Sequence, residues 1–228
     1  MLRCVGRPIA ILSPHLDDAV LSCWHLLAGP GEVAVINVFA GLPPAGAPAG
    51  WWDRMTGHGD ARAVVRARRD EDRAALALAR REAVNLDFLD RQYRPGSDPP
   101  AALAAALREH LPGHALVLAP AALAPMPDSV EKEPGKPHSD HVAVRDAAFA
   151  LRAQGFPVAL YADLPHASVS RLPRWPEKAE RHDLSDRAFA DKLRAVRRYT
   201  TQVEVLERSF GLRLDDPALL GREVCWRP

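Results

Sequence analysis

The chain has 228 residues, which is enough for one domain of ordinary size. Hydrophobic residues make up 47% of it and charged residues 26%, the composition of a globular protein with a sizeable core. Its 30 Lys and Arg and 29 Asp and Glu give a net charge of +1, which argues against a dedicated nucleic-acid-binding protein. No window approaches the 18 consecutive apolar residues of a membrane span. From the charge we expect no nucleic-acid partner, and from the missing span we expect no membrane partner.

The cysteines give no sign of a disulfide framework. Cys4, Cys23 and Cys225 are odd in number, far apart and outside any CxxC pair, which also argues against a cysteine zinc site. The first apolar run is short and lacks a signal-peptide cleavage pattern. We therefore expect free thiols and a cytoplasmic location.

Short apolar runs alternate with helical patterns along the chain. In order, the patterns predict strand Pro8–Ser13, helix Ala19–Ala28, strand Val33–Ala40, a long loop Gly41–Asp60, helix Ala61–Glu82, strand Asn85–Asp90, helix Ala101–His110, strand Ala115–Pro120, an irregular segment Ala121–Pro137, helix His138–Gln154, strand Val158–Leu164, a Pro-broken segment Arg171–Asp186, helix Phe189–Phe210 and a final strand Arg222–Arg227. The first strands are apolar almost throughout, as in a parallel sheet covered on both faces. No repeat or linker divides the chain, so we expect a single α/β domain over residues 1–228.

Two polar clusters follow predicted strands. Ser13-Pro14-His15-Leu16-Asp17-Asp18 ends the first strand, and His138-Ser139-Asp140-His141 opens the helix that follows the fourth. Ligands of open α/β sheets bind outside the carboxyl ends of the strands, so these clusters can meet in space.

The residue types in the clusters suit a divalent metal such as zinc. His15, Asp18 and His141 would provide three nitrogen and oxygen ligands and leave one position open, which is the catalytic arrangement. Asp17 would lie within reach of the water at that position. The competing interpretation is that the carboxylates only cap the two helices.

The quoted motifs resemble those of a known enzyme family. ISPHLDDAVLS resembles the PHPDDE signature of the PIG-L/LmbE-like zinc-dependent N-deacetylases, and PHSDHVAVRDA resembles its second signature, HPDH followed by a helix. The helix RARRDEDRAALALA and the segment Tyr161–His166 also resemble family segments. The resemblance covers most of the chain and implies an LmbE-like fold: one Rossmann-like three-layer domain with a mostly parallel sheet flanked by helices.

The resemblance also implies roles for the motif residues. One Zn²⁺ ion would be held by His15, Asp18 and His141, and Asp17 would be the general base. A protonated His138 would stabilise the oxyanion, and Asp140 would orient or charge-tune one of the two histidines. Either Asp17 or His138 would protonate the leaving amine.

The sequence departs from the family signatures at three places. Leu16 and Ser139 replace prolines, and Ala19 replaces the usual Glu, which is not a ligand in this scheme but can alter the support around the ligands.

Substrate contacts are expected from five further residues, and for most of them there is a structural alternative. Arg68 matches the family's helix Arg, although the arginines around it resemble a solvated face. Asp90 would accept hydrogen bonds from a polyol. Trp51 and Trp52 would stack on a sugar or pack their loop. His166 would line the pocket or lie on the surface.

The resemblance implies a hydrolase that removes an acyl group, in the simplest case acetyl, from an N-acylated amino sugar or glycoconjugate. Two alternatives stay open: an amidase acting on a thiol conjugate, and a non-catalytic carbohydrate- or metal-binding relative. No GxGxxG or GxSxG motif supports a dinucleotide enzyme or a serine hydrolase. The sequence leaves the oligomeric state open, a homo-oligomer included.

Overall fold

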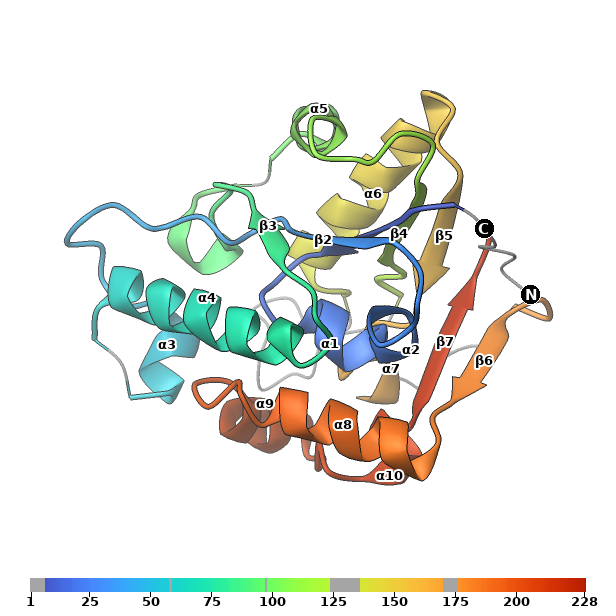
Figure 1. The fold of residues 1–228 in the computed structure, drawn as a ribbon. Helices are drawn as coiled ribbons and strands as arrows, with labels where there is room; N and C mark the ends of the chain where they lie inside the picture. The colour runs from blue at the N-terminus through green and yellow to red at the C-terminus, as the bar shows by residue number, and fades with distance from the viewer. Residues whose placement is uncertain (1–6, 58, 97, 124–135, 170–175) are drawn as a thin grey trace.

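Seven strands form one sheet in the order β3-β2-β1-β4-β5-β7-β6 (Figure 1). The first five strands run parallel, whereas β7 is antiparallel to both β5 and β6. The strands are β1 (Ile9–Ser13), β2 (Val33–Asn37), β3 (Ala83–Asn85), β4 (Leu116–Pro120), β5 (Val158–Tyr161), β6 (Glu180–Asp183) and β7 (Arg222–Trp226).

The structure is a computed structural model that describes residues 7–57, 59–96, 98–123, 136–169 and 176–228. Cys4 and most of the expected irregular segment Ala121–Pro137 lie outside the described residues. The helices are α1 (Asp18–Ser22), α2 (Trp24–Leu27), α3 (Trp51–Met55), α4 (Ala61–Ala77), α5 (Pro100–Arg108), α6 (Ser139–Ala153), α7 (His166–Val169), α8 (Asp186–Val196), α9 (Val203–Phe210) and α10 (Pro217–Leu220), with a short 3₁₀ turn η1 (Arg91–Tyr93). None of these helices has the length and apolar character needed to cross a membrane.

Helices cover both faces of the sheet, as expected for a three-layer α/β fold. Because side chains alternate along a strand, Ile9 and Ile11 of β1 face one layer and Leu12 faces the other. The first layer contains α1, α2, α4, α8 and α9, and the second contains α5 and α6 (Figure 1). The two apolar cores therefore share one sheet.

The strand order places a crevice between β1 and β4. From β1 the chain first builds outward through β2 and β3, and it then crosses to the other side of β1 to form β4 and β5. The helices that follow β1 and β4 diverge at this point, where α/β sheets bind ligands. Both polar clusters of the sequence lie at this crevice.

Two helices expected to be continuous are interrupted by distant carboxylates. The predicted helix Ala19–Ala28 breaks at Cys23, because the backbone N–H groups of Trp24 and His25 donate to Glu223 of β7. The predicted helix Phe189–Phe210 is instead two helices, α8 and α9.

The break between α8 and α9 is held by α4. Glu71 accepts hydrogen bonds from the hydroxyls of Thr200 and Thr201 and from the Thr201 backbone N–H. This contact joins positions about 130 residues apart, so local periodicity does not show it.

Three other expectations were wrong in their element assignment. The third strand is Ala83–Asn85 and not Asn85–Asp90, so Asp90 lies in the loop beyond it. The expected loop Gly41–Asp60 contains the helix α3, and the expected irregular segment Arg171–Asp186 contains the strand β6.

A buried ion pair joins α8 to β7. The Lys192 ammonium donates to the Glu223 carboxylate at 2.6 Å and to the Leu220 carbonyl at 2.9 Å, and Lys192 is fully buried. Glu223 thus neutralises Lys192 and at the same time caps α2.

Candidate metal centre

The first motif forms a tight connection between β1 and α1. The hydroxyl of the buried Ser13 donates to the His15 carbonyl at 2.6 Å and accepts from the Ala19 backbone N–H at 3.1 Å. Asp18 accepts from the His15 backbone N–H at 2.8 Å, and Asp17 makes no capping hydrogen bond. Neither carboxylate caps α1, so the capping alternative was wrong for this motif. The hydrogen bonds of Ser13 and Asp18 support the turn although Ala19 replaces the family's Glu.

The second motif begins α6 directly opposite the first. His138 caps the helix with its ring, because its Nδ1 accepts from the Asp140 backbone N–H at 3.2 Å. One turn in, the fully buried His141 places its Nε2 3.5 Å from the Asp18 Oδ2 atom, and His15 Nδ1 lies 3.5 Å from the same oxygen. Fold topology thus brings together the three residues for which the sequence predicted a metal.

The geometry of His15, Asp18 and His141 fits a zinc ion. Their candidate ligand atoms all lie within 4.8 Å of one another. Two ligands of a tetrahedral zinc, each about 2.0–2.1 Å from the metal, are about 3.3 Å apart, close to the 3.5 Å spacings observed. The buried His141 Nε2 also has no hydrogen-bond partner within the described part of the chain, as expected of an atom kept for a metal.

Each candidate histidine ligand is oriented by a buried carboxylate. His15 Nε2 lies 3.2 Å from Asp140, and His141 Nδ1 lies 2.9 Å from Asp163 at the end of β5. Asp140 was expected to orient a histidine, and its carboxylate contacts His15 and the Arg94 guanidinium, because α6 turns it across the crevice. Such carboxylate–histidine pairs fix the imidazole tautomer and ring orientation at metal sites.

Burial separates the pKa values of the two adjacent aspartates. Burial and the neighbouring Asp18 carboxylate raise the pKa of Asp17 to about 7. Burial also opposes ionisation of Asp18, but His141 and His15 outweigh it and hold the pKa of Asp18 at about 2. At neutral pH Asp18 is therefore a carboxylate suited to a cation, and Asp17 can exchange a proton.

His138 is neutral in this arrangement. Burial, together with His15 and His141, lowers the pKa of His138 well below its usual range. Since its Nδ1 accepts a backbone N–H, the ring proton lies on Nε2. The expectation of a protonated His138 was wrong for this structure, although Nε2–H remains a hydrogen-bond donor.

A pocket lies over these residues, with an empty volume of about 820 Å³ that includes space open to solvent. Its wall includes the five expected substrate contacts Trp51, Trp52, Arg68, Asp90 and His166. Arg68 is buried and pairs with Asp53 at 3.0 Å, so the solvated-face alternative was wrong for it, although Arg66 is exposed.

The other expected contacts differ in how they are held. His166 is buried, with its ring 4.5 Å from that of His141, so the surface alternative was wrong for it. Asp90 accepts two hydrogen bonds from Gln92 and thereby holds the turn η1. Trp51 and Trp52 meet edge to face at 5.5 Å, and Trp52 also packs on the core.

The sequence reasoning missed several residues of the site. Asp163 lies at a strand end, a position that in a parallel sheet could have identified it. Gln202, Leu206 and Phe210 come from the α9 region and carry no motif, so only the tertiary structure places them in the pocket wall.

No protein-family model and no curated protein matches the sequence, but solved structures do. A deacetylase triple mutant of the teicoplanin biosynthetic pathway is 32% identical, with a TM-score of 0.74 and coverage of 97% of both chains. The A40926 pseudoaglycone deacetylase Dbv21 is 32% identical, with a TM-score of 0.74, over 97% of this chain and 96% of that one. The zinc-inhibited form of teicoplanin deacetylase Orf2 is 28% identical, with a TM-score of 0.72, over 97% and 98%.

The chain belongs to the PIG-L/LmbE-like deacetylase family. It is therefore an amide hydrolase with an LmbE-like fold, and zinc is the cofactor that its donor set fits.

Replacing Asp163 by Asn in this deacetylase is expected to weaken zinc binding about 10- to 100-fold, because a neutral amide orients and polarises His141 less well than a carboxylate. Competition with a chromophoric chelator measures the dissociation constant. Asp87→Asn is the matched control, since the Asp87 side chain is 96% exposed. Equal zinc affinity of both variants and the wild type would show that Asp163 has no such role.

Proposed function

We propose that this deacetylase removes an acetyl group from the nitrogen of an amino sugar or glycoconjugate, with His15, Asp18 and His141 as zinc ligands. The observation that carries the proposal is the position of Asp17, a buried carboxylate beside the candidate ligands and in the wall of an open pocket. A protein that only binds metal or sugar has no need of a base there. Relatives that deacetylate in teicoplanin biosynthesis and on the A40926 pseudoaglycone support a glycoconjugate substrate.

Zinc, when bound, supplies a Lewis acid that lowers the pKa of water to about 7 and polarises the acyl carbonyl. Asp17 accepts a proton from the attacking water. His138 donates a hydrogen bond from Nε2 to the carbonyl oxygen as negative charge develops there. Asp140 and Asp163 keep the two histidine ligands in orientation.

The proton needed by the leaving amine is assigned to Asp17. His138 is neutral with Nδ1 committed to the Asp140 backbone N–H, so loss of its Nε2 proton would leave an anionic imidazole. Asp17 instead returns the proton that it took from water. The same carboxyl thus serves as base and then as acid.

The pocket wall provides contacts for the rest of the substrate. The indoles of Trp51 and Trp52 offer apolar faces for a sugar ring, and Arg68 and Asp90 offer a donor and an acceptor for hydroxyl groups. His166 lies deeper, beside His141, with its ring 5.2 Å from Phe210, and is placed to contact the acyl group.

We also propose that residues 1–228 form a single domain, because both apolar cores draw on the same sheet. The free Cys23 is consistent with a cytoplasmic enzyme.

The proposed function is tested by amine release from a panel of N-acetylated amino sugars and glycoconjugates. We expect release from at least one of them, its loss with a chelator, and its recovery when one equivalent of zinc is restored. Amine release from amides of thiol conjugates alone would favour the amidase alternative. No release from any compound by the zinc-loaded protein would reject hydrolysis.

Replacing Arg68 by Lys is expected to raise KM on the order of tenfold without lowering zinc content. Lysine keeps a cation beside Asp53 but loses the planar guanidinium donors. Steady-state kinetics and metal analysis measure the two effects. Arg66→Lys, on the exposed side of the same helix α4, is the control and should behave as wild type. A matching KM for the two variants would remove Arg68 from the substrate site.

A further inference from the structure

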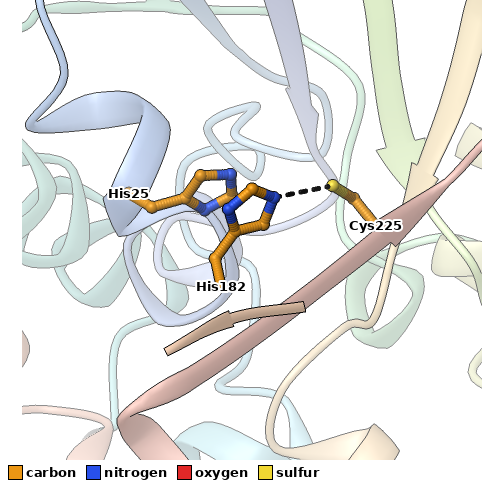
Figure 2. Close-up of side chains that lie close together, drawn as sticks. All are labelled: His25, His182 and Cys225. Atoms are coloured by element: carbon orange, nitrogen blue, oxygen red, sulfur yellow. Dashed lines mark hydrogen bonds between the residues drawn. The ribbon is translucent and has the colours of Figure 1, made fainter. Parts of the chain in front are cut away.

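A second cluster of metal-binding side chains lies apart from the candidate metal centre. His25 belongs to α2, His182 to β6 and Cys225 to β7, and the three side chains gather at the β6–β7 edge of the sheet (Figure 2). None of them lines the pocket. The sequence argued against a cysteine zinc site because its cysteines are isolated, but the fold places two histidines around one of them.

The spacing within the cluster suits one zinc ion. One ligand atom from each of the three residues lies within 4.8 Å of the others. The Cys225 sulfur is 3.7 Å from His182 Nε2. Zinc bound at about 2.3 Å to sulfur and 2.0–2.1 Å to nitrogen would separate these atoms by about 3.6 Å. The rings of His25 and His182 are stacked at 4.0 Å with their planes nearly parallel, so the partly exposed His182 ring has to turn for both lone pairs to reach one ion.

We propose that His25, His182 and Cys225 bind a second metal ion, of the zinc type. Thiolate and imidazole are the ligands that zinc prefers, and binding releases the thiol proton of Cys225 to solvent. Glu180, directly opposite Cys225 in the β6–β7 pairing, has its Oε2 3.9 Å from His182 Nε2 and, among the residues that the structure describes, is a candidate for a fourth ligand. Four protein ligands make a closed, structural site.

The surroundings prepare His25 for this role. Its Nδ1 contacts the fully buried Glu223 side chain, which leaves Nε2 for a metal. Lys192 pairs with the other oxygen of Glu223, so that carboxylate is itself neutralised and fixed. His25 therefore has the outer carboxylate that metal-binding histidines usually have.

The cluster also has a route for the ion. The Cys225 side chain is buried, whereas the His182 side chain is 34% exposed and that of His25 is 15% exposed. A metal can therefore enter from solvent and reach the sulfur. Bound there, it ties α2, which directly follows the α1 ligand helix, to two strands at the sheet edge.

Cobalt substitution tests this site separately from the catalytic one. A thiolate bound to Co²⁺ gives a sulfur-to-metal charge-transfer absorption, which nitrogen and oxygen ligands alone do not give. The full-length protein, stripped of metal and titrated with two equivalents of Co²⁺, should develop this absorption. It should persist in Asp18→Asn, which lacks a ligand of the catalytic site. Its absence from the wild type would overturn the proposal.

Variants of the cluster identify the ligands. Cys225→Ser should abolish the absorption and lower bound zinc from two ions per chain to one. His182→Gln, a partly exposed and conservative change, should weaken the second zinc at least tenfold and tests the site even if Cys225→Ser does not fold. Cys23→Ser is the control and should keep the absorption. An unchanged absorption and zinc affinity in His182→Gln, or loss of the absorption only in a control, would overturn the assignment.

Discussion

Replacing Asp17 by Asn is expected to leave the metal content of the protein unchanged and to lower kcat roughly 10²- to 10⁴-fold, the usual cost of a lost general base. Asp17 is 6% exposed and lines the pocket, but its neighbour Asp18 is the residue whose oxygen approaches both His15 and His141. An amide at position 17 keeps the shape of the side chain and cannot accept the proton. Zinc analysis and kcat, measured on the same preparation, check both parts.

Asp18→Asn provides the contrast. A neutral amide is a poorer ligand than a carboxylate, so this variant is expected to lose catalytic zinc and activity together. The assignment of base and ligand would be reversed if Asp17→Asn lost its metal while Asp18→Asn kept it. Full activity of Asp17→Asn would remove the proposed base from the mechanism.

Replacing Lys192 by Met is expected to lower the free energy of unfolding by about 3–5 kcal/mol at neutral pH, because Glu223 is left charged and buried without its counter-ion. Denaturant unfolding followed by circular dichroism measures the change. Lys178→Met is the control, since Lys178 is exposed and its loss should cost less than about 0.5 kcal/mol. A neutral result for Lys192→Met would show that Glu223 is satisfied by its backbone donors alone.

The loss of unfolding free energy caused by Lys192→Met should become smaller at acidic pH. Burial alone would raise the pKa of Glu223, but Lys192 and His25 outweigh it and hold the value at about 2. A depressed carboxyl pKa stabilises the fold above the ordinary value of about 4.5, and this stability is lost as the pH falls toward 2. The difference in unfolding free energy between wild type and Lys192→Met should therefore shrink below about pH 4.5, and a constant difference would contradict this origin.

Much of the fold could be predicted because apolar runs report buried parallel strands. β1, β2, β4 and β5 all fall within predicted strands, and the final strand Arg222–Trp226 was also expected. The strand β6 gave no such signal, because its residues Glu180–Asp183 are all polar or charged. An apolar pattern in the sequence reports buried side chains, and an edge strand has few buried side chains to report.

In the candidate site, too, residues in local motifs could be predicted, whereas residues that act through distant partners could not. The motifs around His15 and His141 are local in sequence, so their residues could be named in advance. Asp163 and Glu223 act through partners that are 22 and about 200 residues away. No local pattern records such a partnership, because it depends on which strands become neighbours in the sheet.

The charged strand β6 also affects how copies of the enzyme can meet. It forms one end of the sheet, and in many proteins such an outer strand recruits another chain by strand addition. Glu180, Arg181, His182 and Asp183 place ionisable groups along the whole of this strand, and β3 at the opposite end of the sheet is only three residues long. Charged side chains on one outer strand and the short length of the other both disfavour edge-to-edge aggregation of the sheet.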